Sequence, residues 1–324
     1  MYWVKVWLLT SVLAILGISF NETILRAANH QPSLVNDADL FCISYSQLPD
    51  LRHQDVVLLG ASRMGTNFDI NVFQKRFPDR KIIQLAQSGR GTAYPVLKDI
   101  VENSNFKGIV IISETEVTLI SKNKEQQEFV NHCRNNFSLD SRINRNLSSW
   151  FQNKFVFLNP QSSSFRLWGN ILAQQNLPEP FYVKTKADRS DLSDFKRFEP
   201  VALKKLHDNR IKGSKKISEK GWLNQQEWLV KTNHWQPLLK KFQQRGGRAI
   251  FVRMPVSQER WKFESKIFPV DRYWNQFTRR YNIASLHFAE YPSLSHFNLP
   301  DTSHLDMRDR SLFTELLLNE LEIK

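Results

Sequence analysis

Four residues in three short segments have the types and spacing that acyl-transfer chemistry needs. Ser62 directly follows an apolar run that ends in glycine, where a serine hydroxyl can act as a nucleophile. Asp301 and His304 are three residues apart, so the carboxylate can orient an imidazole that deprotonates a serine. Gly89 lies in a glycine-rich turn, where a backbone amide can approach a ligand closely. Each pattern is common by itself, since an isolated serine of this kind usually caps a helix and Asp-x-x-His also suits a surface pair.

Alternating apolar patterns predict the elements that must position these residues. Five short runs are typical of buried parallel strands, at residues 55–60, 81–86, 108–112, 248–254 and 283–288. Helical patterns occupy residues 68–77, 92–102, 225–244, 270–281 and 308–321, the last with Asp306 and Asp309 as a capping box. This alternation predicts an α/β fold with a doubly wound, flavodoxin-like, five-stranded parallel sheet. Ligands of such sheets bind at the carboxyl ends of the strands, which is where Ser62 and Gly89 fall.

The N-terminal segment is apolar enough to interact with a membrane. Residues 6–20 carry no charge, and only Lys5 interrupts the apolar residues before them. If Lys5 snorkels and Trp3 and Trp7 lie at the interface, residues 1–28 form an uncleaved transmembrane helix. A cleaved signal peptide and a buried core helix are the alternatives. Either membrane interpretation makes the protein membrane-associated or exported, facing the periplasm or the cell exterior.

The composition is that of a basic globular protein. The chain has 324 residues, 41% of them hydrophobic, and a formal net charge of +13, which excludes a disordered class and predicts an acidic partner. Nucleic acid is not expected as that partner, because no recognition motif accompanies the charge. No metal or cofactor is predicted, because the histidines lack ligand spacing and no Walker or Rossmann loop is present. Nothing in the sequence places Cys42 near Cys133, so we expect the two not to pair even in an oxidising compartment.

Residues 121–221 interrupt the alternation of strands and helices. Their length predicts a large insertion or lid after the third strand, with residues 29–120 and 222–324 as the two parts of the α/β domain. Residues 184–220 carry twelve Lys or Arg against six Asp or Glu. Because parallel strands end at one edge, a lid inserted there predicts that Lys204 and Lys205 hold an anionic polymer near the nucleophile.

Taken together, these segments resemble the SGNH (GDSL-type) hydrolase and acyltransferase superfamily over residues 55–324. The shared layout is a serine after the first strand, a glycine after the second, and Asp-x-x-His before the last helix. With its anchor and insertion, the chain is most similar to the membrane-anchored branch of cell-envelope polysaccharide O-acyltransferases. That branch includes proteins similar to alginate acetylation factors and to the D-alanyl transfer protein of teichoic acids.

The resemblance implies a role for each of these residues. Ser62 would be the nucleophile, His304 the general base and Asp301 its orienting carboxylate, and the backbone amides of Ser62 and Gly89 would be oxyanion donors. Arg63 and Arg90, which follow these two residues in the sequence, are expected to bind substrate.

One block departs from the superfamily pattern. Where the superfamily usually carries Gly-x-Asn-Asp, residues 113–116 read Ser-Glu-Thr-Glu. Thr115 is the expected replacement donor to the oxyanion, whereas Glu114 and Glu116 would oppose a developing anion unless they point away. The acyltransferase-like branch often lacks the asparagine, so the departure fits that branch better than it fits free esterases.

Two functions therefore remain open. The first is a membrane-anchored serine acyltransferase or esterase that transfers or removes an acyl group, such as acetyl, on a cell-envelope glycan. An acyl donor or a membrane-bound acyl-transfer partner would supply the acyl group. The alternative is a non-catalytic, envelope-anchored protein of the same fold that binds polysaccharide or assembles an acylation complex.

Overall fold

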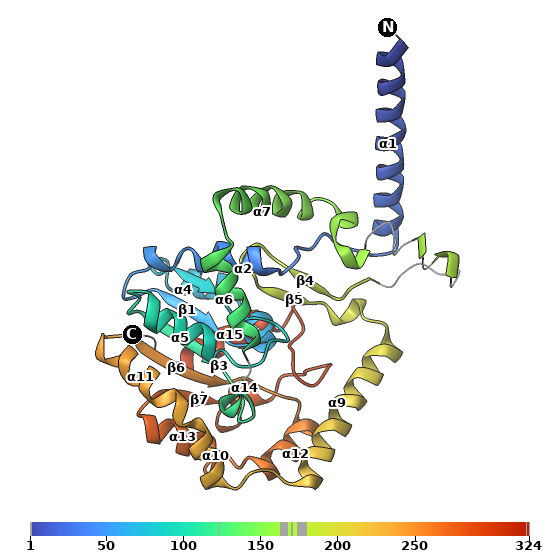
Figure 1. The fold of residues 1–324 in the computed structure, drawn as a ribbon. Helices are drawn as coiled ribbons and strands as arrows, with labels where there is room; N and C mark the ends of the chain where they lie inside the picture. The colour runs from blue at the N-terminus through green and yellow to red at the C-terminus, as the bar shows by residue number, and fades with distance from the viewer. Residues whose placement is uncertain are drawn as a thin grey trace.

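A five-stranded parallel sheet forms the centre of the protein (Figure 1). The computed structural model describes residues 2–122, 124–162, 168–169, 171–173, 180–321 and 323. The strands lie in the order β2-β1-β3-β6-β7, and each neighbouring pair is parallel. Their bounds are β1 Val56–Leu59, β2 Ile82–Gln84, β3 Ile109–Ser113, β6 Arg248–Arg253 and β7 Ala284–His287. The predicted α/β fold with five parallel strands is confirmed, and its order reverses between β1 and β3.

Helices cover both faces of this sheet because the strand side chains alternate. In β1, Val57 and Leu59 face one hydrophobic core, and Val56 and Leu58 face the other. The first core is closed by α2 Ala38–Tyr45, α5 Tyr94–Asn103, α6 Glu125–Asn135, α10 Gln225–Lys231, α11 Trp235–Gln244 and α13 Trp274–Tyr281. The second is closed by α3 Ser62–Asn67, α4 Ile70–Arg76, α14 Pro292–Ser295 and α15 Arg310–Glu320.

Two helix predictions need correction. The single helix expected over residues 225–244 is divided into α10 and α11 by a 3₁₀ turn at Thr232–His234. Pro237, in the first turn of α11, has no backbone N–H and so cannot continue a helix that began earlier. The capping box before α15 is wrong as well: the Asp306 carboxylate accepts from the amide of Phe195, 3.1 Å away, and Asp309 makes no side-chain cap.

Residues 121–221 contribute both to the core and to the rim above the sheet. Their first helix, α6, packs against α2 and α5 and buries Phe129 and Val130 in the first core. Next come α7 Leu139–Gln152 and an antiparallel pair, β4 Val183–Thr185 and β5 Asp191–Ser193. The long helix α9 Pro200–Lys220 packs against α12 Gln258–Ile267.

Cys42 in α2 and Cys133 in α6 form a disulfide, with their Cα atoms 5.2 Å apart. The expectation that they do not pair is therefore wrong. The two residues are separated by 91 positions, and only the packing of α2 on α6 brings them together. A sequence gives no measure of such a distance.

The N-terminal helix α1 Tyr2–Ala27 projects away from the rest of the protein (Figure 1). It is long and apolar enough to span a membrane, and its most apolar window has no side chain buried inside the protein. A buried core helix is thereby excluded for this segment.

Candidate active site

The structure brings Ser62, His304 and Asp301 into one chain of hydrogen bonds. His304 Nε2 lies 2.8 Å from Ser62 Oγ, and His304 Nδ1 lies 2.7 Å from Asp301 Oδ2. Ser62 precedes Asp301 and His304 by more than two hundred positions, yet all three residues lie beyond the carboxyl ends of the strands. This arrangement can pass a proton from the serine hydroxyl to an oriented imidazole.

Ser62 gains its position from a tight turn at the end of β1. Gly60 has φ 141°, and a Cβ there would lie 2.8 Å from the carbonyl oxygen of Ser113 in β3. Only glycine therefore allows β1 to pass so close to β3 before the chain turns into α3. Ser62 is the first residue of α3, so its side chain stands at the edge of the sheet.

The turn from Asp301 to His304 holds the acid and the base in fixed positions. Asp301 Oδ1 accepts hydrogen bonds from the amides of Ser303 at 3.0 Å and His304 at 2.8 Å. Thr302, which follows Asp301 directly, is fully buried and adopts φ 77°. This left-handed conformation costs a β-branched residue about 1–3 kcal/mol. The surrounding contacts impose this strain, as expected where a backbone must aim a functional side chain.

Asp301 is held as a carboxylate. Burial would raise the pKa of Asp301, but the hydrogen bond from His304, the charges of His304 and Arg210 and the amide of Ser303 together hold that pKa well below its usual value. Arg210 Nη1 lies 2.7 Å from Asp301 Oδ2 and donates to Ser303 Oγ at 2.6 Å. An ionised Asp301 can stabilise the imidazolium that forms when His304 takes a proton.

Two backbone amides are available to bind an oxyanion. Among the described residues, nothing accepts a hydrogen bond from the amide of Ser62 or that of Gly89, and both residues line the same cavity. Gly89 has φ 76°, which favours glycine at this position. Thr115 also lines the cavity, but its hydroxyl lies 3.0 Å from the Thr118 hydroxyl and accepts from the Thr118 amide. Its hydroxyl is thus engaged in a local turn.

Both glutamates of the departing block have partners of their own. Glu114 Oε1 accepts from the Thr92 hydroxyl at 2.9 Å and from the Ala93 amide at 2.6 Å. Burial nevertheless raises the pKa of Glu114 to about 7, against the effect of these hydrogen bonds. The Glu116 carboxylate instead lies 3.0 Å from Arg253 Nε. Neither carboxylate is therefore left without a donor beside Ser62.

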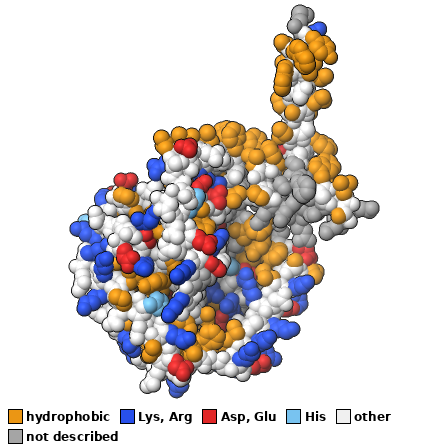
Figure 2. Space-filling model, viewed as in Figure 1, with side chains coloured by type: hydrophobic (Ala, Val, Ile, Leu, Met, Phe, Trp, Pro, Cys, Tyr) orange, Lys and Arg blue, Asp and Glu red, His pale blue; other side chains and the backbone are white. Residues whose placement is uncertain are grey.

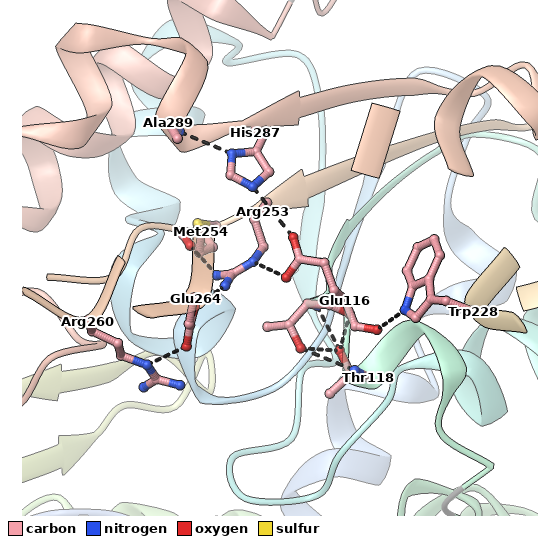
Figure 3. A network of polar contacts seen from close by, with 10 residues as sticks. Glu116, Thr118, Trp228, Arg253, Met254, Arg260, Glu264, His287 and Ala289 are labelled. Carbon is pink, nitrogen blue, oxygen red and sulfur yellow. Dashed lines mark hydrogen bonds and ion pairs between the residues drawn. The ribbon is translucent and has the colours of Figure 1, made fainter. Parts of the chain in front are cut away.

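A buried ionic network ties the ends of three strands together (Figure 3). Arg253, the last residue of β6, lies between the carboxylates of Glu116 and Glu264, with its Nη2 2.6 Å from Glu264 Oε2. His287, the last residue of β7, lies 3.5 Å from Glu116, and Arg260 Nε is 2.6 Å from Glu264. Burial opposes the ionised form, but the charge of Arg253 and the contact with His287 lower the pKa of Glu116 to about 2. The network fixes one wall of the cavity beside Ser62.

Ser62 and His304 lie where two cavities meet. The first, of about 470 Å³, is also lined by Ser88, Arg90 and Tyr182. The second, of about 510 Å³, has a wall of arginines, namely Arg63, Arg210, Arg253 and Arg260. A nucleophile shared by two cavities can receive one substrate from each side.

Among the residues that the structure describes, Arg63 is the arginine of the second cavity without an ion-pair partner. Arg253 and Arg260 contact glutamates, and Arg210 contacts Asp301, whereas no carboxylate among the described residues contacts Arg63. Burial, with the charges of Arg253 and Arg260, lowers the pKa of Arg63 well below its usual value. An arginine stays protonated in proteins, so this site favours an anion.

The other residues expected to bind substrate lie in different surroundings. Arg90 lines the first cavity and stacks on the Phe129 ring at 4.7 Å. Lys204 and Lys205 are exposed on α9, where Lys204 is 2.7 Å from Asp208, and neither belongs to the wall of either cavity. They are not brought to Ser62.

Sequence reasoning missed two residues that the structure places at the site. Arg210 comes from a different face of α9 than Lys204, and a single arginine in a basic helix gives no signal of its partner. Asp191 of β5 binds the Ser88 hydroxyl at 2.8 Å, next to the glycine turn. Only the tertiary fold of residues 183–220 over the strand ends could reveal either one.

Comparison with known proteins adds no family to this description. No protein-family model matches the chain, and no curated protein matches it. What the site can do must be argued from its own geometry.

Proposed function

We propose that the protein is a membrane-anchored serine acyltransferase or esterase of the SGNH type, which acts on acyl groups of a cell-envelope glycan. The observation that carries this proposal is the hydrogen-bond chain from Ser62 through His304 to Asp301. The strand order β2-β1-β3-β6-β7 supports it, because the serine, the glycine turn and the Asp-x-x-His segment all converge on one edge.

The first half of the reaction forms an acyl-enzyme. Ser62 Oγ attacks the acyl carbonyl carbon while its proton moves to His304 Nε2. The carbonyl oxygen becomes an oxyanion, and the free amides of Ser62 and Gly89 would stabilise it. When this intermediate collapses, the bond to the donor oxygen or sulfur breaks and the leaving group takes the proton from His304. Ser62 then carries the acyl group as an ester.

The second half resolves this ester. A glycan hydroxyl, or water, gives its proton to His304 and attacks the acyl carbon. Collapse of the second tetrahedral intermediate returns the proton to Ser62 Oγ and leaves the acyl group on the acceptor. The two cavities that share Ser62 favour transfer over simple hydrolysis, because donor and acceptor can occupy opposite sides of one nucleophile.

α1 and the disulfide both support the proposed compartment. A disulfide between α2 and α6 supports an oxidising environment outside the cytoplasm. A catalytic domain exported there beside its anchor would meet envelope polymers.

A fluorophosphonate activity probe tests the proposal directly. Wild-type protein should be labelled, Ser62→Ala should not, and His304→Ala should be labelled far more slowly because Ser62 loses its base. The Ser62→Ala/His304→Ala variant should lose no more turnover than either single variant, since the residues act as one unit. Ser257→Ala, which changes a helix-capping serine of α12, is the matched control and should still be labelled. An unlabelled wild type that shows a normal unfolding transition would overturn the enzymatic role.

Arg63 predicts that the acceptor or donor carries a negative charge. Arg63→Met should raise KM for an anionic acyl substrate, because a charge-assisted contact at this half-buried arginine is worth about 1.5–3 kcal/mol, or about 10–100-fold. For a neutral ester of similar size the change should be much smaller. Steady-state kinetics on the pair of substrates measure the difference. Equal changes for both substrates would show that Arg63 has a structural role only.

A further inference from the structure

Helix α7 has its apolar and polar faces reversed relative to a helix of a water-soluble domain. Its apolar side chains point to solvent, at spacings of three and four residues that place them on one face. Their exposed fractions are Leu139 71%, Ile143 53%, Leu147 56%, Trp150 58% and Phe151 45%. In water such a continuous apolar face is unfavourable, so it marks a surface that another phase or molecule covers.

The inward face of α7 is polar and firmly held. Arg145 is buried and contacts Asp37 at 2.9 Å and the carbonyl of Val35 at 3.0 Å. The Gln152 side chain accepts from the amide of Val35 at 3.1 Å. The outward apolar face is therefore not an effect of a loosely placed helix, because these contacts fix the rotation of α7 about its axis.

The segment that follows α7 is bound to the end of α1. Glu22 accepts hydrogen bonds from the amides of Val156 at 2.9 Å and Phe157 at 3.2 Å, and Arg26 donates to the carbonyl of Lys154 at 2.7 Å. Leu25 packs against Val156, and both are fully buried. The depth of α7 relative to α1 is thus set by direct contacts and not by a flexible linker.

The dimensions of α1 place this junction at a membrane surface. Residues 2–20 of α1 are exposed and mainly apolar, and at 1.5 Å per residue they extend about 29 Å, the thickness of a hydrocarbon core. Glu22 then lies at the headgroup level, and so does the segment bound to it. Figure 1 shows α7 running across the direction of α1 near the end where α1 joins the domain. In Figure 2, hydrophobic side chains cover the edge of the domain that faces along α1.

We propose that α7 is an interfacial helix, whose apolar face lies in the same bilayer that α1 spans. An amphipathic helix with Trp and Leu on its apolar face binds in this way at the boundary of headgroups and acyl chains. Two attachments, α1 and α7, hold the domain in one orientation on the membrane. The cavity lined by Leu34, Val35 and Asn36, which follow α1 in the chain, then opens close to the bilayer.

Spin labels on the full-length protein test this arrangement in nanodiscs of phosphatidylethanolamine and phosphatidylglycerol. Both native cysteines are in the disulfide, so a single introduced cysteine can be labelled selectively. Ile143→Cys and Leu147→Cys report on the outward face of α7, and Lys240→Cys on α11, far from α1, is the matched water-exposed control. The measured quantity is the ratio of the collision rate with oxygen to the collision rate with a water-soluble nickel complex. This ratio should be several-fold higher for the labels at 143 and 147 than for the label at 240.

Each result decides the proposal. Higher relative oxygen accessibility at 143 and 147, with the unfolding transition of the labelled proteins unchanged, supports bilayer contact. Nickel accessibility equal to that at 240 overturns it, and leaves the apolar face of α7 for a protein partner. Since 143 and 147 are more than half exposed, both labels should be tolerated by the fold, and agreement between them guards against a local artefact. The outcome does not depend on whether Ser62 is a nucleophile.

Discussion

At the scale of single residues, the site depends on how charge is distributed around His304. Asp301 is fully buried, its carboxylate accepts from two amides and from the imidazole, and Arg210 forms an ion pair with it. Its negative charge is thereby kept at low pH, and the imidazole is fixed with Nε2 toward Ser62. Arg210 acts through Asp301 and is a positioning residue.

Replacing Arg210 tests this role. Arg210→Met should lower kcat about 10–100-fold, because a charge-assisted hydrogen bond worth about 1.5–3 kcal/mol is lost. Removing the cation should also make the Asp301–His304 pair easier to protonate, so the acid limb of the pH–rate profile should move to higher pH. Arg210→Lys keeps the charge and should restore the position of that limb. A profile unchanged in Arg210→Met would limit Arg210 to a packing role.

Glu114 gives a second residue-scale prediction, which concerns stability and not turnover. Burial raises the pKa of Glu114 in the folded protein to about 7, whereas the usual pKa of a glutamate is 4.5. The folded state therefore binds more protons between these pH values, and its free energy of unfolding falls as pH rises through this window. Glu114→Gln should remove that loss, on the order of 2–3 kcal/mol, because each pKa unit corresponds to about 1.4 kcal/mol.

Urea unfolding at pH 4.5 and pH 8 measures this effect. The stability of Glu114→Gln relative to wild type should be higher at pH 8 than at pH 4.5. Glu102→Gln is the matched control, since Glu102 is half exposed and pairs with Lys98 at 3.9 Å. If the stability of both variants relative to wild type changes equally between pH 4.5 and pH 8, the raised pKa of Glu114 is contradicted.

At the scale of elements, segments distant in sequence build the rim above the sheet. Arg189, between β4 and β5, is buried and donates to the carbonyls of Gln84 at 2.8 Å and Ala86 at 3.0 Å, at the end of β2. Burial lowers the pKa of Arg189 to about 10, so it remains charged at neutral pH. This contact holds the β4–β5 pair over the cavity, and α9 supplies Arg210 from the other side.

The disulfide between α2 and α6 is an element-scale contribution to stability. Cross-linking residues 91 positions apart restricts the unfolded chain, and such a loop stabilises the folded state by about 2–5 kcal/mol. The Cys42→Ala/Cys133→Ala variant should lose about this much in chemical unfolding, and a reducing agent should destabilise wild type similarly. The reducing agent should have no effect on the double variant. Unchanged unfolding of reduced wild type would mean that the bond is absent in solution.

At the scale of the whole molecule, the net charge of +13 is shared between the arginines of the two cavities and exposed lysines such as those of α9. Lys204 and Lys215 on α9 pair with carboxylates one turn away, so this exposed face is partly neutralised. Arg63 lines the cavity of the nucleophile, and no carboxylate in the described part of the chain forms an ion pair with it. Specific recognition of an anion therefore belongs to the cavity, whereas the basic surface contributes a salt-dependent attraction at longer range.

Features that depend on local pattern could be predicted before the fold was known. Buried parallel strands are continuous apolar runs, so the five strands, their parallel arrangement and the edge that holds Ser62 could be predicted. The apolar helix α1 was likewise predictable, because membrane-spanning length and composition are properties of a contiguous segment. The pairing of Ser62 with His304 was implied by the resemblance of the motif layout to a known superfamily.

Contacts between side chains that are distant in the sequence depend on how the elements pack. The pairing of Cys42 with Cys133, the contact of Arg210 with Asp301 and the partners of Glu114 all depend on packing between elements. The sequence of α7 has an apolar and a polar face, but this pattern does not show which of the two faces points inward. That choice is made by the buried contacts of Arg145 and by the attachment to α1 at Glu22. Contact energies between segments far apart in the chain leave no periodic signal in the sequence, which is why these features could be read only from the fold.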